Sequence, residues 1–151
     1  MQQNQLSLSD EAQIRWMLER YYFAIDAKDE AIMCSCFAKD ALIVYHTGEK
    51  HEVRLNGHAE LMKYLHSGIA WNGPSIHALS NSVVKVTGAN TAKASAYAIA
   101  HLVVEGKVLV RGLRYDDSIV RQGESWVIKH RDHRSVWQYE AQNLPSHLPG
   151  R

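Results

Sequence analysis

Apolar and polar positions near the start of the chain follow the spacing of a helix. Between residues 9 and 27, apolar side chains recur at three- and four-residue steps, which predicts a helix with one apolar stripe. The stripe consists of Ile14, Met17, Leu18, Tyr21, Tyr22 and Ile25. Asp26 follows directly and lies on or beside the stripe. A second, short helix is expected after Asp29, which can cap its first turn.

The middle of the chain changes from strand to helix pattern. A β-branched and aromatic run over 41–46 predicts a strand, and 51–55 predicts a short partner strand beyond a turn at 48–50. Asn56 and Gly57 open a third helix, which is expected to end near Gly68 and to be followed by a loop.

The second half of the chain consists of four long strand-like runs. They cover about 75–87, 91–104, 108–121 and 125–137, and compact turns separate them. Short connections make consecutive strands antiparallel neighbours, so this half is expected to be a meander. Helices followed by such a sheet predict an α+β fold with the helices on one face. Long strands curl, and a curled sheet closed by helices forms a cone with a pocket.

Composition and charge narrow the classes of function. The sequence is 46% hydrophobic and 22% charged, with a formal net charge of +1 and no basic run, which argues against nucleic acid and anionic membranes as partners. No apolar run approaches a membrane span, and the first residues lack a signal-peptide pattern, so we expect the cytoplasm. The sequence shows no phosphate-binding glycine loop, serine-nucleophile elbow or metal-ligand pair, so we expect no cofactor and no metal.

A carboxylate aimed at a core needs a partner, which makes Asp26 a candidate for chemistry. Residues of like parity share a face of a strand, and on this basis His77 lies on one face with Leu79 and Asn81. An Asp26–His77 pair would provide a general base near neutral pH, because the carboxylate orients the ring and stabilises the imidazolium. The alternative is that Asp26 is the polar end of a frayed helix and that His77 is a structural residue.

The strand expected over 91–104 has two contrasting faces. Its even positions from 92 to 100 are all alanine, which would let a helix or another subunit approach closely. Its other face carries Tyr97 and His101 among aliphatic side chains, a mixture that suits the wall of a pocket. Tyr97 and Tyr45 could equally be wall residues without a chemical role.

Five short motifs follow one another along the chain. They are Tyr21-x-x-x-x-Asp26-x-x-Asp29, a strand ending in Tyr45, His77-x-x-x-Asn81, Arg114-Tyr115-Asp116-Asp117 and Trp126-x-Ile128. Their order and spacing resemble the SnoaL-like branch of the NTF2-like superfamily over about residues 9–138. The resemblance implies an α+β cone, in which about three N-terminal helices pack on a strongly curved antiparallel sheet that encloses a pocket. We expect one such domain over 1–151, with tails over 1–8 and 139–151.

The resemblance also implies a set of site residues. The dehydratases and the dehydrochlorinase of this branch are cofactor-free lyases with an Asp–His dyad, which corresponds to Asp26 and His77 here. Four further catalytic residues are implied, namely Tyr21, Tyr45, His101 and Arg134. The residues expected to bind substrate are Tyr97, Asn81, Trp71 and Arg131. Arg131 is also the rival of Arg134 for the role of binding an anionic substituent.

These inferences converge on one leading function and two alternatives. The leading function is a cofactor-independent lyase, dehydratase-like, or an isomerase that acts on a hydrophobic, cyclic, polyketide- or steroid-like molecule. The alternatives are a non-catalytic small subunit of a ring-hydroxylating dioxygenase and a small-molecule-binding module without turnover. We expect a homodimer or homotrimer, for which the alanine row and the end of the sheet near Trp137 would suit the interface.

Overall fold

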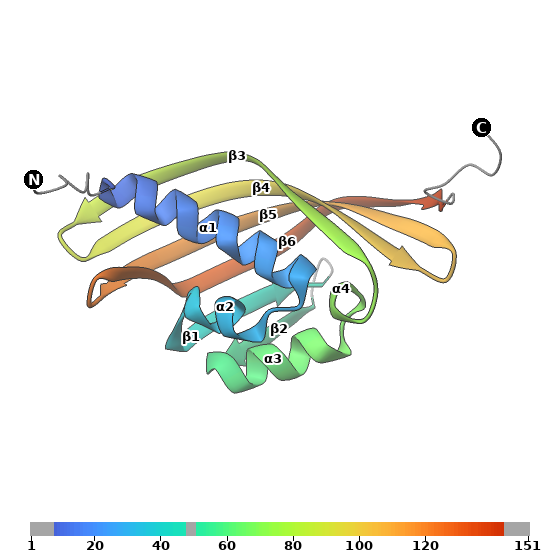
Figure 1. Ribbon diagram of the computed structural model, residues 1–151, viewed down its shortest axis with the longest axis horizontal. Coiled ribbons are helices and arrows are strands. Elements are labelled where there is room, and N and C mark those ends of the chain that lie inside the picture. The colour runs from blue at the N-terminus through green and yellow to red at the C-terminus, as the bar shows by residue number, and fades with distance from the viewer. Residues whose placement is uncertain (1–7, 48–50, 144–151) are drawn as a thin grey trace, which may run out of the picture.

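The computed structural model describes residues 8–47 and 51–143 of the chain (Figure 1). In this part the elements are α1 (Asp10–Ala27), α2 (Glu30–Ser35), β1 (Phe37–His46), β2 (Glu52–Asn56), α3 (Gly57–Ser67), α4 (Ile69–Asn72), β3 (Ser75–Gly88), β4 (Thr91–Val104), β5 (Lys107–Gln122) and β6 (Ser125–Gln142). The turn expected at 48–50, and the expected tails up to residue 7 and from residue 144, lie outside the described residues. β6 continues to Gln142, past the predicted start of the second tail at 139.

The strands form one sheet in the order β2-β1-β6-β5-β4-β3. β3 to β6 pair consecutively and antiparallel, which confirms the predicted meander. β1 and β6, however, pair in parallel, so the sheet is mixed and not wholly antiparallel as expected. These two strands are far apart in the sequence, and no short turn therefore dictates their relative direction.

The helices cover one face of this curved sheet, which confirms the α+β class. α1 crosses the sheet, and α3 runs beside β1 and β2 (Figure 1). The Ser9 hydroxyl accepts a hydrogen bond from the Ala12 N–H at 3.3 Å and so caps α1. The helix ends at Ala27, and Lys28 caps it in the left-handed conformation with φ 59°. Asp29 then caps α2 by accepting from the Ile32 N–H at 2.9 Å.

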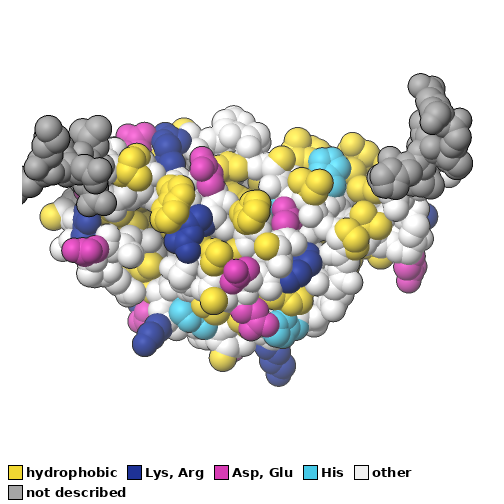
Figure 2. All heavy atoms as spheres, in the orientation of Figure 1, with side chains coloured by type: hydrophobic (Ala, Val, Ile, Leu, Met, Phe, Trp, Pro, Cys, Tyr) yellow, Lys and Arg dark blue, Asp and Glu magenta, His cyan; other side chains and the backbone are white. Residues whose placement is uncertain are grey.

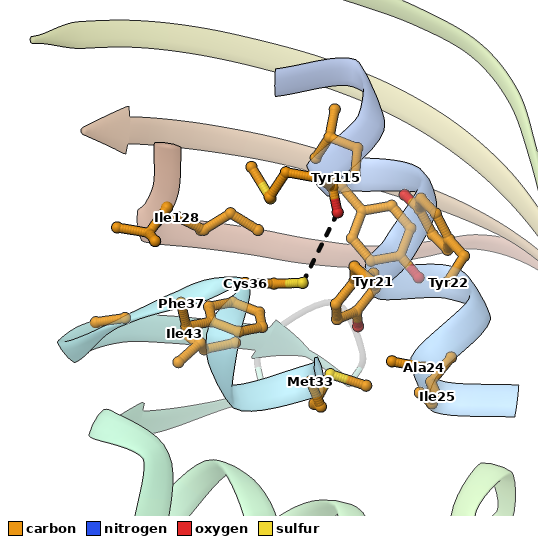
Figure 3. Packing of buried hydrophobic residues seen from close by; sticks show 14 of the residues in the cluster. Tyr21, Tyr22, Ala24, Ile25, Met33, Cys36, Phe37, Ile43, Tyr115 and Ile128 are labelled. Atoms are coloured by element: carbon orange, nitrogen blue, oxygen red, sulfur yellow. Dashed lines mark hydrogen bonds between the residues drawn. The ribbon is translucent and has the colours of Figure 1, made fainter. Parts of the chain in front are cut away.

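The hydrophobic core lies between α1 and the sheet. Tyr21 and Tyr22 meet edge to face with ring centroids 5.1 Å apart, and Tyr115 of β5 lies 5.4 Å from Tyr22 (Figure 3). The even-numbered alanines of β4 are buried, and most belong to the same core as the side chains of α1. Of the two predicted roles for the alanine row, contact with a helix layer is therefore the one observed.

The face of the molecule that carries α1 shows hydrophobic side chains interspersed with acidic and basic ones (Figure 2). Within the described ranges, none of the helices has the length and apolar character needed to cross a membrane.

Candidate active site

Asp26 and His77 are in direct contact. Asp26 stands in the last turn of α1, and His77 stands near the start of β3. The ring Nδ1 of His77 lies 2.7 Å from Oδ1 of Asp26, and the His77 backbone N–H donates to Oδ2 at 2.6 Å. The side chains of His77 and Asp26 are 5% and 22% exposed, respectively. The pair therefore links the end of the first helix to the meander in a largely buried position.

A second set of hydrogen bonds holds the Asp26 carboxylate. The Ser75 hydroxyl donates to Oδ1 at 2.7 Å and accepts from the Lys28 ammonium at 3.0 Å. The same ammonium donates to the backbone carbonyl of Ala70. Burial acts to raise the pKa of Asp26, but hydrogen bonds from the His77 ring and backbone and from Ser75 outweigh it, so the pKa is lowered. Asp26 is accordingly an ionised, fixed acceptor.

A cavity of about 300 Å³ adjoins His77, between α1, α3, α4 and the sheet. This volume lies at the lower end of the range for small-molecule sites. The walls include apolar side chains and a set of polar ones, among them Tyr21, Tyr45, Tyr64, Arg111, Tyr115 and His133. His77 itself lines the cavity, and its Nε2 has no hydrogen-bond partner among the described residues. This nitrogen is therefore available to a ligand.

Three of the lining tyrosines are potential hydrogen-bond donors. Burial raises the pKa of Tyr21, and it raises the pKa values of Tyr45 and Tyr115 well above the ordinary value. Their hydroxyl groups thus remain protonated at neutral pH. Tyr45 and Tyr115 also pack against the ring of His133, with centroid separations of 4.7 and 4.8 Å.

His133 lines the cavity although its sequence pattern does not single it out. A bulge in β6 shifts the register between the pairs Ile119–Ile128 and Ser118–His130, and such a bulge reverses the inward and outward alternation. Burial lowers the pKa of His133 to about 3, so the ring is neutral at neutral pH. Its Nδ1 is buried without a hydrogen-bond partner in the part of the chain described. The residue left out of the register is Lys129, and nothing in the local sequence pattern marks it as the site of a bulge.

Because of this bulge, neither Arg134 nor Arg131 is placed as the sequence predicted. Arg134 is turned to the exposed outer face and does not line the cavity. Arg131 is turned inward but is fully buried and bound to Asp117 through two hydrogen bonds of 2.7 and 2.6 Å. Its guanidinium also lies 4.2 Å from the ring centroid of Tyr21. The arginine that does line the cavity is Arg111 of β5, which the sequence patterns did not indicate.

A family model of the SnoaL-like domain matches residues 6–132. The chain belongs to the SnoaL-like family. A comparison with curated proteins found no match.

Several solved structures have the same fold as this SnoaL-like chain. A proposed scytalone dehydratase from Novosphingobium aromaticivorans is 17% identical, with a TM-score of 0.73 and 92% of each chain covered. A proposed aromatic ring hydroxylase from the same species is 20% identical, with a TM-score of 0.76, over 91% of this chain and 96% of that one. A hexachlorocyclohexane dehydrochlorinase of LinA type 3 from Novosphingobium barchaimii is 15% identical, with a TM-score of 0.75, over 91% and 94%. At these identities the likeness shows the fold alone.

Two residues expected in the site of the SnoaL-like protein point away from the cavity. His101 and Tyr97 lie on the outer face of β4, because the alanines between them occupy the inner face. Tyr97 contacts the guanidinium of Arg114, which lies 5.8 Å from its ring centroid. The expectation that this face of β4 lines the pocket is therefore wrong.

Asn81 and Trp71 also lie outside the cavity lining. A bulge in β3 between Leu79 and Ser82 reverses the alternation, so Asn81 is exposed on the outer face. Trp71 of α4 packs against the ring of His66, with centroids 5.4 Å apart. Among the described residues, no group of three or more histidine, cysteine, aspartate or glutamate side chains is arranged to hold a metal ion.

Proposed function

We propose that this SnoaL-like protein is a cofactor-independent lyase of the dehydratase type, or an isomerase, with His77 as its general base. The observation that carries the proposal is the 2.7 Å contact between Nδ1 of His77 and the ionised Asp26 beside the cavity. A histidine held in this way has a fixed tautomer, and its Nε2 is free to accept a proton. A positioned base of this kind contributes roughly 10²–10⁴ to the rate.

The proposed reaction begins with proton transfer from a carbon next to a carbonyl group to Nε2 of His77. Asp26 stabilises the imidazolium that results. Tyr45 and Tyr21 donate hydrogen bonds to the oxygen on which negative charge develops. In a lyase, the electrons of the broken C–H bond form a double bond while a leaving group departs from the adjacent carbon. In an isomerase, the imidazolium returns the proton to a different carbon.

The cavity supports a hydrophobic, cyclic substrate. Apolar side chains such as Ile25, Leu102 and Leu113 form much of the lining, and aromatic rings form much of the rest. A volume of about 300 Å³ favours the smaller ring systems within the polyketide- and steroid-like class. Elimination is also the reaction type in the names of two of the similar structures, a dehydratase and a dehydrochlorinase.

Hydrogen exchange tests the proposed base even while the substrate is unidentified. Cyclic ketones and cyclic β-hydroxy ketones are incubated with the protein in D₂O and followed by NMR. Exchange of the ketones appears as loss of the α-proton signal, and elimination of water from the β-hydroxy ketones appears as the signals of the unsaturated product. Catalysed exchange or elimination is expected, and Asp26→Asn and His77→Gln should each abolish most of it. His66→Gln, at an exposed histidine paired with Glu30, is the control that should retain the activity. Full activity in both dyad variants would refute the mechanism.

A second candidate is the non-catalytic subunit, because the outer face of the sheet exposes aromatic side chains. Tyr97, Trp137 and Tyr139 are 43%, 46% and 56% exposed on it. Such a surface suits contact with another protein chain, either a larger partner or a second copy in a homodimer or homotrimer. Stoichiometric co-purification with a larger metalloprotein, together with no exchange activity, would favour the subunit. Ligand binding without turnover would instead favour a binding module.

A further inference from the structure

Three residues stand side by side across the sheet beneath the cavity. Ala100 of β4 is the register partner of His77 on β3 and also of Arg111 on β5. Residues directly opposite one another in an antiparallel pair point to the same face, and all three line the cavity. Neighbouring strands are about 4.8 Å apart, so the backbones at His77 and Arg111 are about 10 Å apart across the small methyl group of Ala100.

Arg111 has no counterion within the described part of the chain. It makes no hydrogen bond or ion pair there, and its Nε is buried without a partner. Arg131, the other inward-facing arginine, has its charge balanced by Asp117 through Nε and Nη2, although its Nη1 is also buried without a partner. A guanidinium does not lose its proton in a protein, and a buried donor without an acceptor is unfavourable. The unfilled donor at Arg111 therefore points to an acceptor that a ligand supplies.

The surroundings of Arg111 favour an anionic acceptor. The cavity lining described above contains no aspartate or glutamate side chain. The neighbouring His133 ring has a buried, unpartnered Nδ1 and is a second polar group without an internal partner. A guanidinium presents parallel N–H donors that match the two oxygens of a carboxylate. An organic carboxylate thus fits the charge and the geometry of this wall.

We propose that Arg111 binds a carboxylate group of the substrate while the reacting carbon lies over Ala100 at Nε2 of His77. The substrate class is then a small cyclic or aromatic acid whose reactive C–H bond lies on the far side of the ring system from its carboxylate. The role of His77 in this arrangement rests on the proposed function, whereas the carboxylate site rests on the geometry of Arg111 alone.

Binding of matched ligands tests the carboxylate site without any turnover. 2-Naphthoate and 2-naphthamide have the same shape and differ in charge, and their affinities are measured by isothermal titration calorimetry. We expect the wild-type protein to bind the carboxylate roughly tenfold or more tightly than the amide, because hydrogen bonds to charged groups are the stronger ones. Arg111→Met should remove this preference. Arg134→Met, at an exposed arginine outside the cavity, is the matched control and should retain it.

Equal affinity of the wild-type protein for the two ligands would overturn the proposal, and this result does not depend on whether any variant folds. A carboxylate preference that persists in folded Arg111→Met would also overturn it. These outcomes are distinct from failure of the proposed function, which would appear as exchange activity that survives Asp26→Asn and His77→Gln.

Discussion

His77 binds both oxygens of the Asp26 carboxylate, one through its ring and one through its own backbone N–H. The two contacts, at 2.7 and 2.6 Å, fix the imidazole relative to the strand that carries it and relative to the end of α1. Neither the helix nor the strand can therefore shift without disturbing the orientation of the ring. The geometry of the dyad depends on the packing of the whole helix against β3.

Ser75 is expected to be a positioning residue for this dyad. Ser75→Ala removes the hydroxyl that donates to Asp26 at 2.7 Å, which should raise the pKa of Asp26 and lower kcat by roughly tenfold. The carboxyl pKa is measured by NMR and kcat by the exchange assay. The matched control is Ser82→Ala, whose hydroxyl on the same strand accepts from Arg15 at 2.8 Å. Equal kcat and equal carboxyl pKa in both variants would contradict this role.

His133 should make the stability of the protein depend on pH. Its pKa is lowered from 6.5 to about 3, so between these values the unfolded chain binds one proton more than the folded one. Its contribution to the free energy of unfolding is fully present above pH 6.5. As the pH falls toward 3, this contribution should decrease by at most about 1.4 kcal/mol per pH unit.

Urea denaturation from pH 7 to pH 4 measures the His133 effect. His133→Gln should have a shallower dependence of unfolding free energy on pH than the wild type. His66→Gln, at an exposed position, should leave the wild-type dependence in place. Parallel curves for wild type and His133→Gln would show that His133 titrates normally.

The folded protein should be strongly destabilised when either partner of the buried Arg131–Asp117 pair is lost. Arg131→Met leaves the Asp117 carboxylate buried without its counterion, and a loss of about 3–5 kcal/mol is expected. The double variant Arg131→Met/Asp117→Leu should recover much of this loss, because no unpaired charge remains. Urea denaturation at pH 7 measures each variant. Arg114→Met, which breaks the exposed Arg114–Asp116 pair, is the control and should change stability little.

Ala100 should tolerate a larger side chain better than an alanine packed in the core. Ala100→Leu extends into the cavity, so it should abolish binding of 2-naphthoate with a small change in unfolding free energy. Ala92→Leu on the same face of β4 has no cavity to enter and should be destabilising by about 1–3 kcal/mol. Calorimetric titration and urea denaturation of both variants provide the comparison. Retained ligand binding in Ala100→Leu would mean that ligands do not lie over this residue.

Much of the fold could be predicted because the signals for it are local. Apolar spacing defines α1, the Asp29 cap starts α2, and compact turns separate the strands of the meander. The contact between Asp26 and His77 could be anticipated because helical spacing places Asp26 at the end of α1 and because His77 precedes the register shift in β3. Their catalytic role stays a proposal.

The remaining site predictions failed where alternation along a strand is interrupted. Asn81 lies within the register shift of β3, and Arg134 lies beyond one in β6, so a simple count of parity assigns each to the wrong face. His101 and Tyr97 were misplaced for a different reason. An alanine face can pack inward as well as outward, and only the tertiary structure decides which. Arg111 was missed because its significance comes from pairing across strands, which no local pattern reports.

The parallel pairing of β1 with β6 has a consequence for how the protein is synthesised. While the chain emerges from the ribosome, β1 is made early but its central neighbour is made last. Until β6 is complete, β1 and β5 each present an open hydrogen-bonding edge, which is the kind of surface that recruits chaperones or promotes aggregation. A transcript truncated before β6 should therefore yield an insoluble or rapidly degraded product, even though it encodes both Asp26 and His77.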